Sequence, residues 1–372
     1  MIRVLHSYSG NLYGGVETLL ATLARNRELC PAMESHFALC FGGRLSKELT
    51  ASRAPLHMID EVRVRWPLTV RRARRRFGEL LRRGDFDLVA CHSPWAQAIF
   101  GPVVRSAGLP LVFWLHDAID GSHWLERWAG LTPPDLALCC SGYTASKLVN
   151  IYPRMAAKLV HHPVAPAKSE RSTADRAAVR AELNTPPDAT VIVQVGRMEP
   201  LKGHSLHLEA LAKLSNLPEW ILWQVGGPQR AHELRYQKDL QEWARRLGIA
   251  SRVRFAGERS DVPELLAAAD IYCQPNARPE GFGITLIEAL MAGLPVVAGA
   301  FGGAKEIVDE SCGVLVAPGD AHALAASLRP LIQDRALRSN LGARGPARAR
   351  KLCDPATQML QLNEVLSGAA RR

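Results

Sequence analysis

Two glutamates eight residues apart, Glu280 and Glu288, form the most informative pattern in the chain. Glu280 stands in a glycine-containing loop, and Glu288 follows just over two turns into the helix that this loop is expected to open. Carboxylates accept hydrogen bonds from vicinal hydroxyls, whereas loop glycines and the first N–H groups of a helix suit a phosphate. A ligand with hydroxyls at both ends and phosphate between them is a sugar nucleotide, and we expect this segment to bind one.

Two cations, Arg197 and Lys202, lie on a loop after the strand predicted at 190–195. The planar fork of an arginine and the point charge of a lysine can converge on one diphosphate. The alternative is a solvent-facing loop with two unrelated cations. The position favours binding, because open α/β sheets bind ligands at the carboxyl ends of parallel strands.

Weaker candidates follow strands predicted in the first half. Gly14 and Gly15 let backbone N–H groups approach a phosphate, although a plain turn is the simpler explanation. His116 follows the strand at 111–115 and is either a site residue or a structural histidine beside a helix-capping aspartate. His92 is a minor candidate of the same kind.

Other side chains of the first half are more typical of packing. We interpret Trp95 and Trp124 as packing residues, with the alternative that they stack on an acceptor sugar. His161 and His162 are interpreted as structural.

The net charge of +10 is concentrated in one segment. Residues 63–83 contain nine arginines and one glutamate, which gives this segment a charge of +8. An apolar stripe at helical spacing runs through it, made of Val70, Ala73, Phe77 and Leu80. The segment is either a surface helix with a solvated basic face or a helix whose basic face meets phospholipid headgroups or a phosphorylated acceptor through Arg71, Arg72 and Arg75. Nucleic acid is not expected, because no aromatic stacking motif accompanies the arginines.

The eight cysteines lie mostly within apolar, strand-like runs, so we expect buried free thiols. No C-x2-C or H-x3-H spacing occurs, and the sequence therefore predicts no metal site. Cationic side chains and helix N-termini can neutralise a diphosphate leaving group without a metal. We accordingly expect a reaction that needs neither a metal ion nor a cofactor.

Short β-like runs alternate with helical stretches along all 372 residues, the pattern of βαβ units with parallel sheets. Since one core rarely extends over such a length, two domains are expected. We predict an acceptor-side domain at 1–165, a nucleotide-sugar domain at 166–355, and a C-terminal helix and tail at 356–372 that packs back on the first domain. The proline-containing stretch 162–171 is the predicted linker. The predicted strands are 3–5, 36–40, 56–59, 88–91, 111–115, 136–139, 158–161, 190–195, 220–225, 252–255, 271–273, 295–297 and 313–316.

Taken together, these motifs resemble the retaining glycosyltransferases of family four, which have the GT-B architecture of two facing Rossmann-like domains around a cleft. The resemblance spans nearly the whole chain. It rests on Gly14-Gly15-x-Glu17, His116-Asp117, Gly196-Arg197-x4-Lys202-Gly203, Gly226-Gly227-Pro228 and Glu280-x7-Glu288. It implies an α/β GT-B fold and a hexosyltransferase that moves a sugar from a nucleoside diphosphate to a saccharide, lipid-linked or small-molecule acceptor.

By that resemblance, Arg197 and Lys202 would hold the donor diphosphate and Glu288 the ribose. Glu280 would contact the transferred sugar, and His116 would lie against the same sugar. The other residues that the resemblance assigns to the donor are Gly14, Gly15, Gly226, Phe255, Phe282, Gly283, Ile284 and Thr285.

Two other functions also fit the sequence: a sugar-nucleotide epimerase or phosphorylase on the same architecture, and a non-catalytic module that binds an anionic surface through residues 63–83. The apolar start at residues 1–5 is too short for a signal peptide, and no apolar run approaches 18 residues. We therefore expect a cytoplasmic protein, with residues 63–83 as the segment for any peripheral contact with the inner face of the membrane.

Overall fold

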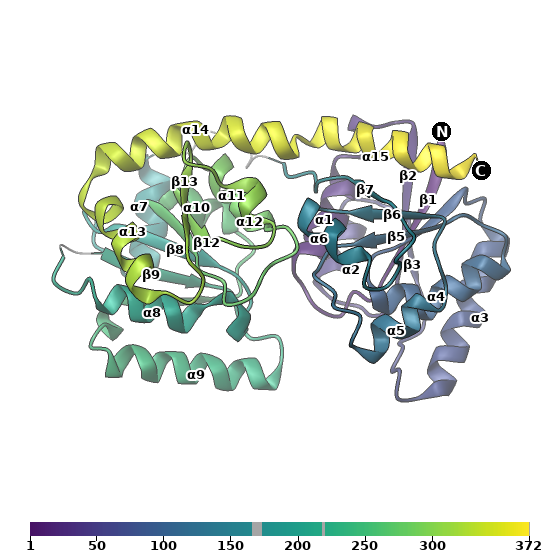
Figure 1. Cartoon of the computed structure of the whole chain (residues 1–372), viewed down its shortest axis with the longest axis horizontal. Coiled ribbons are helices and arrows are strands. Elements are labelled where there is room, and N and C mark those ends of the chain that lie inside the picture. The colour runs from purple at the N-terminus through teal and green to yellow at the C-terminus, as the bar shows by residue number, and fades with distance from the viewer. Residues whose placement is uncertain (166–172, 218–219, 372) are drawn as a thin grey trace. The chain divides into compact units, whose positions relative to one another are not determined.

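The computed structural model describes residues 1–165, 173–217 and 220–371, and it contains two compact units. Unit 1 comprises Met1–Ala165 and Cys353–Arg372, and unit 2 comprises Pro166–Leu352 (Figure 1). The first boundary coincides with the predicted one, whereas the C-terminal segment of unit 1 begins three residues earlier than expected. Of the predicted linker, residues 166–171 lie outside the described part of the chain. Residues 162–164 are buried and belong to unit 1, so they do not act as a linker.

Unit 1 contains a parallel sheet of seven strands in the order β3-β2-β1-β4-β5-β6-β7. The strands of the first half are therefore all confirmed, with small shifts at their ends. From β1 the chain adds strands on one side and then crosses over to β4, so the topological switch point lies between β1 and β4. The strands are β1 (Ile2–Tyr8), β2 (Met33–Leu39), β3 (Leu56–Met58), β4 (Leu88–Cys91), β5 (Leu111–Leu115), β6 (Leu136–Cys139) and β7 (Ala157–Leu159).

Helices cover both faces of this sheet, because consecutive apolar strand residues point to opposite sides. Val4 lies in one core cluster and Leu5 in another. The Val4 side is covered by α1 (Gly15–Arg25), α2 (Arg44–Ala51) and α15 (Pro355–Ala370). The Leu5 side is covered by α3 (Pro67–Arg83) and α4 (Pro94–Ser106), and α6 (Gly142–Leu148) packs in a third cluster. The remaining short helices are η1 (Arg27–Leu29) and α5 (Trp124–Gly130).

The C-terminal helix α15 is part of the core of unit 1. Met359, Leu362 and Leu366 are buried together with strand residues of β1, β4 and β5. Asp354 caps the helix through its carboxylate, which accepts a hydrogen bond from Thr357 N at 2.9 Å. The tail therefore packs against the first half of the chain, although more than 180 residues of unit 2 separate them in sequence.

Unit 2 contains a parallel sheet of six strands in the order β10-β9-β8-β11-β12-β13. Its switch point lies between β8 and β11. The strands are β8 (Thr190–Val195), β9 (Trp220–Val225), β10 (Val253–Gly257), β11 (Ile271–Gln274), β12 (Val296–Gly299) and β13 (Gly313–Val316). The helices are α7 (Thr173–Glu182), η2 (Pro200–Lys202), α8 (His204–Ala212), α9 (Ala231–Arg246), η3 (Ala250–Arg252), α10 (Val262–Ala268), α11 (Ile284–Met291), α12 (Ala304–Ile307), α13 (Ala321–Gln333) and α14 (Arg335–Cys353).

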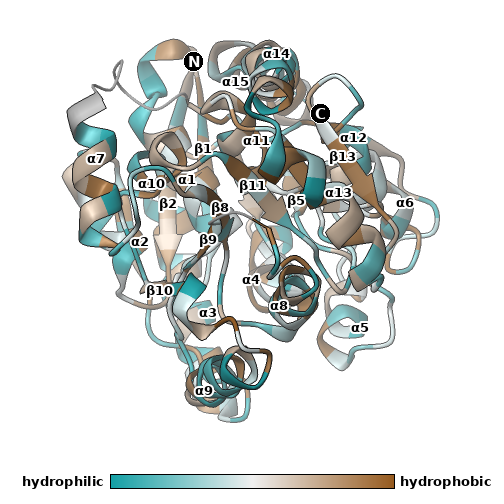
Figure 2. Cartoon of the chain, turned by 90° about the vertical axis from the view of Figure 1, so that its left-hand side faces the viewer, coloured by the Kyte–Doolittle hydropathy of each residue, from teal (hydrophilic) through white to brown (hydrophobic). Residues whose placement is uncertain are grey.

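Polar residues dominate the outer surface of α9, which is drawn largely in teal in Figure 2. Its apolar side contributes Leu240 and Ala244 to the same core cluster as β8, β9 and α13. This arrangement, a parallel sheet with helices packed on it, is that of a doubly wound α/β domain.

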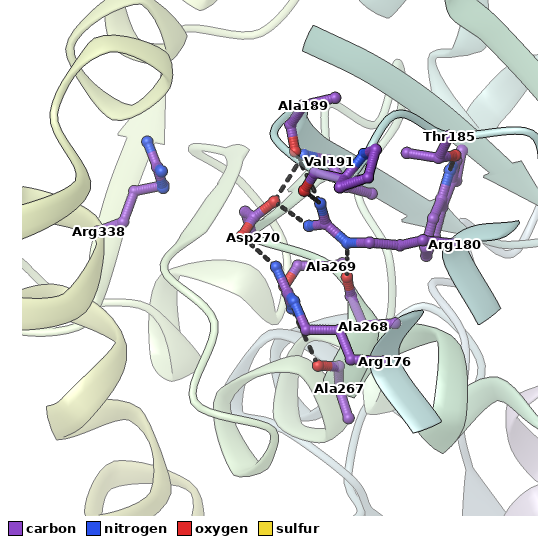
Figure 3. Close-up of polar contacts among 12 residues, drawn as sticks. Arg176, Arg180, Thr185, Ala189, Val191, Ala267, Ala268, Ala269, Asp270 and Arg338 are labelled. Carbon is purple, nitrogen blue, oxygen red and sulfur yellow. Dashed lines mark hydrogen bonds and ion pairs between the residues drawn. The ribbon is translucent and has the colours of Figure 1, made fainter. Parts of the chain in front are cut away.

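A buried ion network fixes α7 to the sheet of unit 2 (Figure 3). Asp270, which directly precedes β11, accepts hydrogen bonds from Arg176, Arg180 and the backbone N–H of Val191 at 2.6, 2.6 and 2.7 Å. Arg180 also donates to the carbonyls of Ala189 and of Ala268. Because α7, β8 and β11 meet at one carboxylate, the helix that opens unit 2 is tied to the two central strands.

The basic segment forms helix α3, and its predicted apolar stripe packs on the core, with Leu81 as a further member. Val70, Ala73 and Phe77 are buried as predicted, but the next buried position is Leu81, while Leu80 is only partly buried. The stripe follows steps of three, four and four residues, because α3 packs along its length against α4. Across the described residues, no helix combines the length and the apolar character that a membrane span requires.

Candidate active site

The loops that follow β8 and β11 approach each other at the switch point of unit 2. Gly203 has a φ of 72°, and a Cβ atom there would lie 1.8 Å from the carbonyl oxygen of Pro275. Ala277 N donates to the carbonyl of Leu201 at 2.8 Å. Only glycine permits this approach, since any larger residue would push the two loops apart. The glycine after Lys202 therefore positions the cation against the loop that carries Glu280.

Lys202 and Glu280 form an ion pair in which both groups are held in place. The Nζ of Lys202 donates to Oε1 of Glu280 at 2.7 Å, and Nδ2 of Asn276 donates to Oε2 at 2.8 Å. Gln274 in turn donates to Oδ1 of Asn276 at 2.6 Å. Burial alone would raise the pKa of Glu280, but the charge of Lys202 and the hydrogen bonds from Lys202 and Asn276 hold it below its usual value. The site thus contains a charged, oriented carboxylate.

Glu288 lies just over one turn into α11, not two as expected, because the helix begins only at Ile284. Its environment differs from that of Glu280. Its side chain is partly accessible, and it forms no hydrogen bond or ion pair with the residues that the structure describes. Burial raises its pKa to about 7. Burial also raises the pKa of the Tyr272 hydroxyl, and the charges of Glu280 and Glu288 add to that effect, so both carboxylates face the same region. Glu288 is therefore a carboxylate that is available to accept hydrogen bonds from a ligand.

Arg197 is held by two carboxylates that the sequence did not indicate. Its guanidinium forms an ion pair with Glu199 and lies 3.9 Å from Oε1 of Glu233, a fully buried residue of α9. Its Nε–H is buried and has no hydrogen-bond partner among the described residues. An unsatisfied buried N–H carries a free-energy cost that an incoming acceptor relieves. The arginine therefore presents a free donor as well as a positive charge.

The remaining residues of unit 2 that the resemblance assigns to the donor lie at or near neighbouring strand ends. At Gly226, φ is 133° and a Cβ atom would lie 1.9 Å from the carbonyl oxygen of Gly196, so the ends of β8 and β9 meet closely. Phe255, in β10, packs partly buried on the core. Phe282, Gly283 and Ile284 are buried around the start of α11. Thr285 is partly accessible in its first turn, where helix N–H groups are unpaired.

Gly14, Gly15 and His116 belong to unit 1 instead. Gly14 is the N-cap of α1 and Gly15 its first residue. Trp95 is partly buried and packs edge-on against Phe100, which fits the packing interpretation. Trp124 is 51% exposed, so its ring remains available for stacking.

The most unusual polar cluster of unit 1 is a chain of four buried histidines. His6 Nδ1 lies 2.8 Å from His92 Nε2, and His92 Nδ1 lies 3.0 Å from His116 Nε2. His116 Nδ1 lies 2.9 Å from His162 Nε2, so both ring nitrogens of His116 are engaged by other histidines. His162, interpreted from the sequence as structural, is thus a direct partner of the predicted site residue.

These histidines are neutral, because burial lowers their pKa values and neighbouring histidines lower them further. The pKa falls to about 3 for His6 and His162, and well below its usual value for His92 and His116. The sequence signal for the histidine chain is that all four members directly follow predicted strands, at 3–5, 88–91, 111–115 and 158–161. Their mutual contacts depend on strand order, which the sequence alone did not supply.

The acidic triplet Asp85-Phe86-Asp87 has the Asp-x-Asp spacing that can bind a metal ion, and it was missed in the sequence. It precedes β4, so it lies at the amino end of that strand. Asp87 accepts a hydrogen bond from the backbone N–H of Arg3 at 2.6 Å. This position is opposite to the strand ends that carry the other candidate residues.

Comparisons with known proteins establish the family. The model for glycosyl transferases group 1 matches residues 175–348, and the model for glycosyltransferase family 4 matches residues 13–168. A D-inositol 3-phosphate glycosyltransferase of Catenulispora acidiphila is 32% identical over 70% of this chain and 67% of its own length. A phosphatidyl-myo-inositol mannosyltransferase of Mycolicibacterium smegmatis is 29% identical over 80% of this chain and 78% of its own length.

The fold is that of a GT-B glycosyltransferase. The crystal structure of Anabaena Alr3699/HepE in complex with UDP and glucose aligns with a TM-score of 0.87 at 25% identity, covering 99% of this chain and 100% of that one. This chain belongs to glycosyltransferase family 4. Some matches cover less of the relative: the lipopolysaccharide core biosynthesis glycosyltransferase LpsE of Rhizobium meliloti, 34% identical over 45% of this chain, is matched over 46% of its length.

Proposed function

We propose that this glycosyltransferase moves a hexose-type sugar from a nucleoside-diphosphate sugar to a saccharide, lipid-linked or small-molecule acceptor, with retention of anomeric configuration and without a metal ion. The observation that carries the proposal is the set of Lys202, Glu280 and Glu288 at the switch point of unit 2. A paired cation, an oriented carboxylate and an unpartnered carboxylate match the phosphate and hydroxyl groups of a sugar nucleotide.

Charge neutralisation supports a metal-independent reaction. The diphosphate leaving group gains negative charge as the bond to the anomeric carbon breaks. Lys202, the free Nε–H of Arg197 and the first N–H groups of α11 supply positive charge and hydrogen-bond donors for it. When the diphosphate arrives, Lys202 exchanges part of its interaction with Glu280 for the phosphate, and Asn276 still holds the Glu280 carboxylate.

Retention by direct attack of the acceptor is supported by the hydrogen bonds of the Glu280 carboxylate. Both oxygens of Glu280 accept hydrogen bonds, so the group is poorly suited to attack an anomeric carbon. We propose that the acceptor oxygen attacks on the face from which the diphosphate leaves. The new bond forms between that oxygen and the anomeric carbon, the bond from the anomeric carbon to the phosphate oxygen breaks, and the acceptor proton passes to the leaving phosphate.

A donor screen tests the donor class. Thermal unfolding with UDP, GDP and ADP, alone and as nucleotide sugars, is expected to show stabilisation by one nucleoside diphosphate, about 2.7 kcal/mol at 100 times its Kd. Because the HepE neighbour was crystallised with UDP and glucose, UDP-glucose is the first donor to test. If none of these compounds stabilises the protein, or if Glu280→Ala and Glu288→Ala leave the shift unchanged, the donor assignment is wrong.

The reaction itself distinguishes the transferase from an epimerase or phosphorylase. A transferase releases nucleoside diphosphate in proportion to added acceptor, apart from slow hydrolysis, and needs no phosphate. Proton NMR of the glycoside formed gives its anomeric configuration, and an inverted product would refute retention. Full activity after dialysis against EDTA is expected, whereas activity restored only by a divalent cation would refute metal independence.

The role of His116 in unit 1 stays a prediction from the family resemblance. We propose that it acts on the transferred sugar, and we expect His116→Ala to lower kcat more than it raises the donor Kd. Since both ring nitrogens of His116 are engaged by other histidines, such a role requires one of these hydrogen bonds to be exchanged. An unchanged kcat would remove His116 from the reaction.

We also propose that α3 contacts an anionic membrane surface, which would suit a lipid-linked acceptor. Trp66 and Leu68 at the start of the helix are 58% and 78% exposed, and Arg71 is exposed beside them. Exposed apolar residues next to cations are typical of helices that lie in the interface. Part of the basic face is already neutralised, however, because Arg72 and Arg76 both pair with Asp60 at 2.6 Å and Arg75 lies 3.8 Å from Glu79.

Sedimentation with vesicles tests the membrane contact. Wild-type protein should sediment with vesicles that contain an anionic phospholipid at low salt and less at high salt. Trp66→Ser combined with Leu68→Ser should reduce sedimentation while leaving the net charge unchanged. If wild-type protein does not sediment at low salt, the basic face is only solvated.

A further inference from the structure

Three strand ends of unit 1 bring a set of metal-binding side chains together. His116 follows β5, Cys140 follows β6 and His162 lies after β7, three neighbouring strands of the sheet. One nitrogen of each imidazole and the sulfur of Cys140 all lie within 4.8 Å of one another, and all three residues are buried. Metal-ligand motifs with short intervals do not detect this set, because its members are separated by more than 20 residues of sequence.

We propose that His116, Cys140 and His162 form a binding site for a zinc ion. Two imidazole nitrogens and one thiolate are ligands that zinc prefers, and three protein ligands leave one coordination position open. Tetrahedral zinc holds such ligand atoms about 3.3–3.6 Å apart, from bond lengths of about 2.0–2.3 Å. To reach that geometry, the atoms farthest apart would approach by about 1.2 Å at most, and His116 Nδ1 and His162 Nε2, now 2.9 Å apart, would separate by about 0.4 Å, which small side-chain rotations allow.

The existing contacts of the three side chains do not oppose this change. The thiol of Cys140 makes only long contacts, to the carbonyl of His116 at 3.4 Å and to Oγ1 of Thr144 at 3.7 Å. A thiol is a weak hydrogen-bond donor, so little is lost when it turns. His116 Nδ1 and His162 Nε2 already face each other at 2.9 Å. The metal would take the place of the single proton between them, and that proton would pass to Nδ1 of His162, which stays a neutral imidazole.

The histidine chain supplies the outer hydrogen bonds that a metal site needs behind its His116 ligand. A His116 ligand that binds through Nδ1 must carry its proton on Nε2, where it donates to His92 Nδ1. His92 then donates from Nε2 to His6 Nδ1, and His6 donates from Nε2 to Oγ of Ser35 at 3.3 Å. One arrangement of protons therefore satisfies every link and fixes the ligand tautomer, the function of outer hydrogen bonds in metal sites.

Charge and access also suit a divalent ion. Binding releases one proton, from the thiol of Cys140, so the ion and the thiolate together carry one positive charge. Asp117 directly follows the proposed ligand His116 in the sequence, and its carboxylate acts electrostatically on the Cys140 thiol. Its negative charge leaves the loaded site neutral. Asp117 is exposed and His116 is 6% exposed, so this side provides the entry path.

Zinc binding would hold His116 and prevent it from turning toward a substrate. This consequence depends on the role of His116 proposed above, whereas the site itself does not. The tests therefore measure metal binding directly, so that failure of the site and failure of the proposed reaction can be distinguished.

Equilibrium dialysis of the untagged full chain against zinc, with metal determined by elemental analysis, is expected to give one ion per chain. Cobalt(II) as a probe should give the absorption of a tetrahedral ion and a sulfur-to-cobalt charge-transfer band. Cys140→Ala should lose both the stoichiometric binding and the charge-transfer band. The matched control is Cys139→Ala, which removes the neighbouring buried thiol from β6 and should keep both.

A second variant tests the chain behind the ligands. His92→Ala should weaken zinc binding about 10–100-fold without changing the stoichiometry, because it removes the acceptor for His116 Nε2–H. Circular dichroism and thermal unfolding establish that each variant is folded. Failure of wild-type protein to bind zinc, equal binding by Cys140→Ala, or a cobalt complex without the charge-transfer band would each overturn the site.

Discussion

Glu288 gives the sharpest test of the proposed donor site, because the charge of its carboxylate should destabilise the folded protein and strengthen donor binding. Burial raises the pKa of its carboxyl from the ordinary 4.5 to about 7. The folded protein therefore favours the protonated form, whereas ribose hydroxyls require the charged acceptor form. The substitution Glu288→Gln keeps the shape of the side chain and removes its titration.

The magnitudes follow from the size of the pKa shift. Because the folded pKa lies above the unfolded one, Glu288 costs nothing below pH 4.5, and its penalty grows as the pH rises through 4.5 to 7. At pH 8 the penalty is about 3 kcal/mol. Glu288→Gln should therefore raise the free energy of unfolding by up to about 3 kcal/mol at pH 8 and leave it unchanged at pH 4.

Donor binding should depend on pH in the opposite sense. About one tenth of the Glu288 carboxyls are charged at pH 6 and about nine tenths at pH 8, so the nucleoside diphosphate should bind about tenfold more tightly at pH 8. Glu288→Gln should bind more weakly at pH 8 and lose this part of the pH dependence. The ratio of the Kd values of wild-type protein and Glu288→Gln at each pH cancels the effect of the ligand's own titration.

The assays are calorimetric titration with the nucleoside diphosphate at pH 6, 7 and 8 and urea unfolding at pH 4 and 8. Glu310→Gln, an exposed glutamate of the same unit, serves as the matched control and should change neither quantity. If the variant at position 288 binds with the same pH dependence as wild-type protein, the carboxylate does not contact the donor. If it is not stabilised at pH 8, the reasoning from burial is wrong.

Three further substitutions test the site and the fold. Lys202→Ala should lower kcat/KM, with a loss of about 2–4 kcal/mol of transition-state stabilisation, the size seen when one preorganised hydrogen-bond donor is removed from an active site. Unchanged kinetics would show that Lys202 is not part of the site. Asp270→Ala should destabilise unit 2 by about 3–5 kcal/mol in urea unfolding, because the buried Arg180 loses its counter-charge. A loss below about 1 kcal/mol would show that water replaces the carboxylate. Leu362→Ala should cost unit 1 about 2–5 kcal/mol, and a smaller loss would mean that α15 is not part of its core.

Most of the fold could be predicted because each parallel strand has a recognisable local sequence pattern. Each strand is a short run of buried apolar residues between helical stretches, and every predicted strand is present in the structure. The exact helix face was harder to predict, as Leu80 and Leu81 show. Both are apolar neighbours, and only the packing of α3 on α4 decides which is buried.

The contact between the loops of the candidate site was predictable to the extent that its residues lie in continuous motifs. Lys202 and Glu280 occur in glycine-containing loops after strands, and parallel topology places both loops at one edge. Glu233 and Asn276 were missed because their importance arises only from contact. Glu233 comes from a helix more than 30 residues away from Arg197, and no spacing rule connects them.

The histidine chain shows the same limit more strongly. Spacing rules for metal sites assume ligands on one loop or helix, whereas a parallel sheet brings residues together across its carboxyl edge. His116, Cys140 and His162 are neighbours because β5, β6 and β7 are adjacent in the sheet, and His6 joins them because β1 and β4 pair across the switch point. For a doubly wound protein, a search for metal ligands should therefore compare the residues that follow successive strands. In this chain, that comparison finds the proposed zinc ligands, where intervals along the sequence show none.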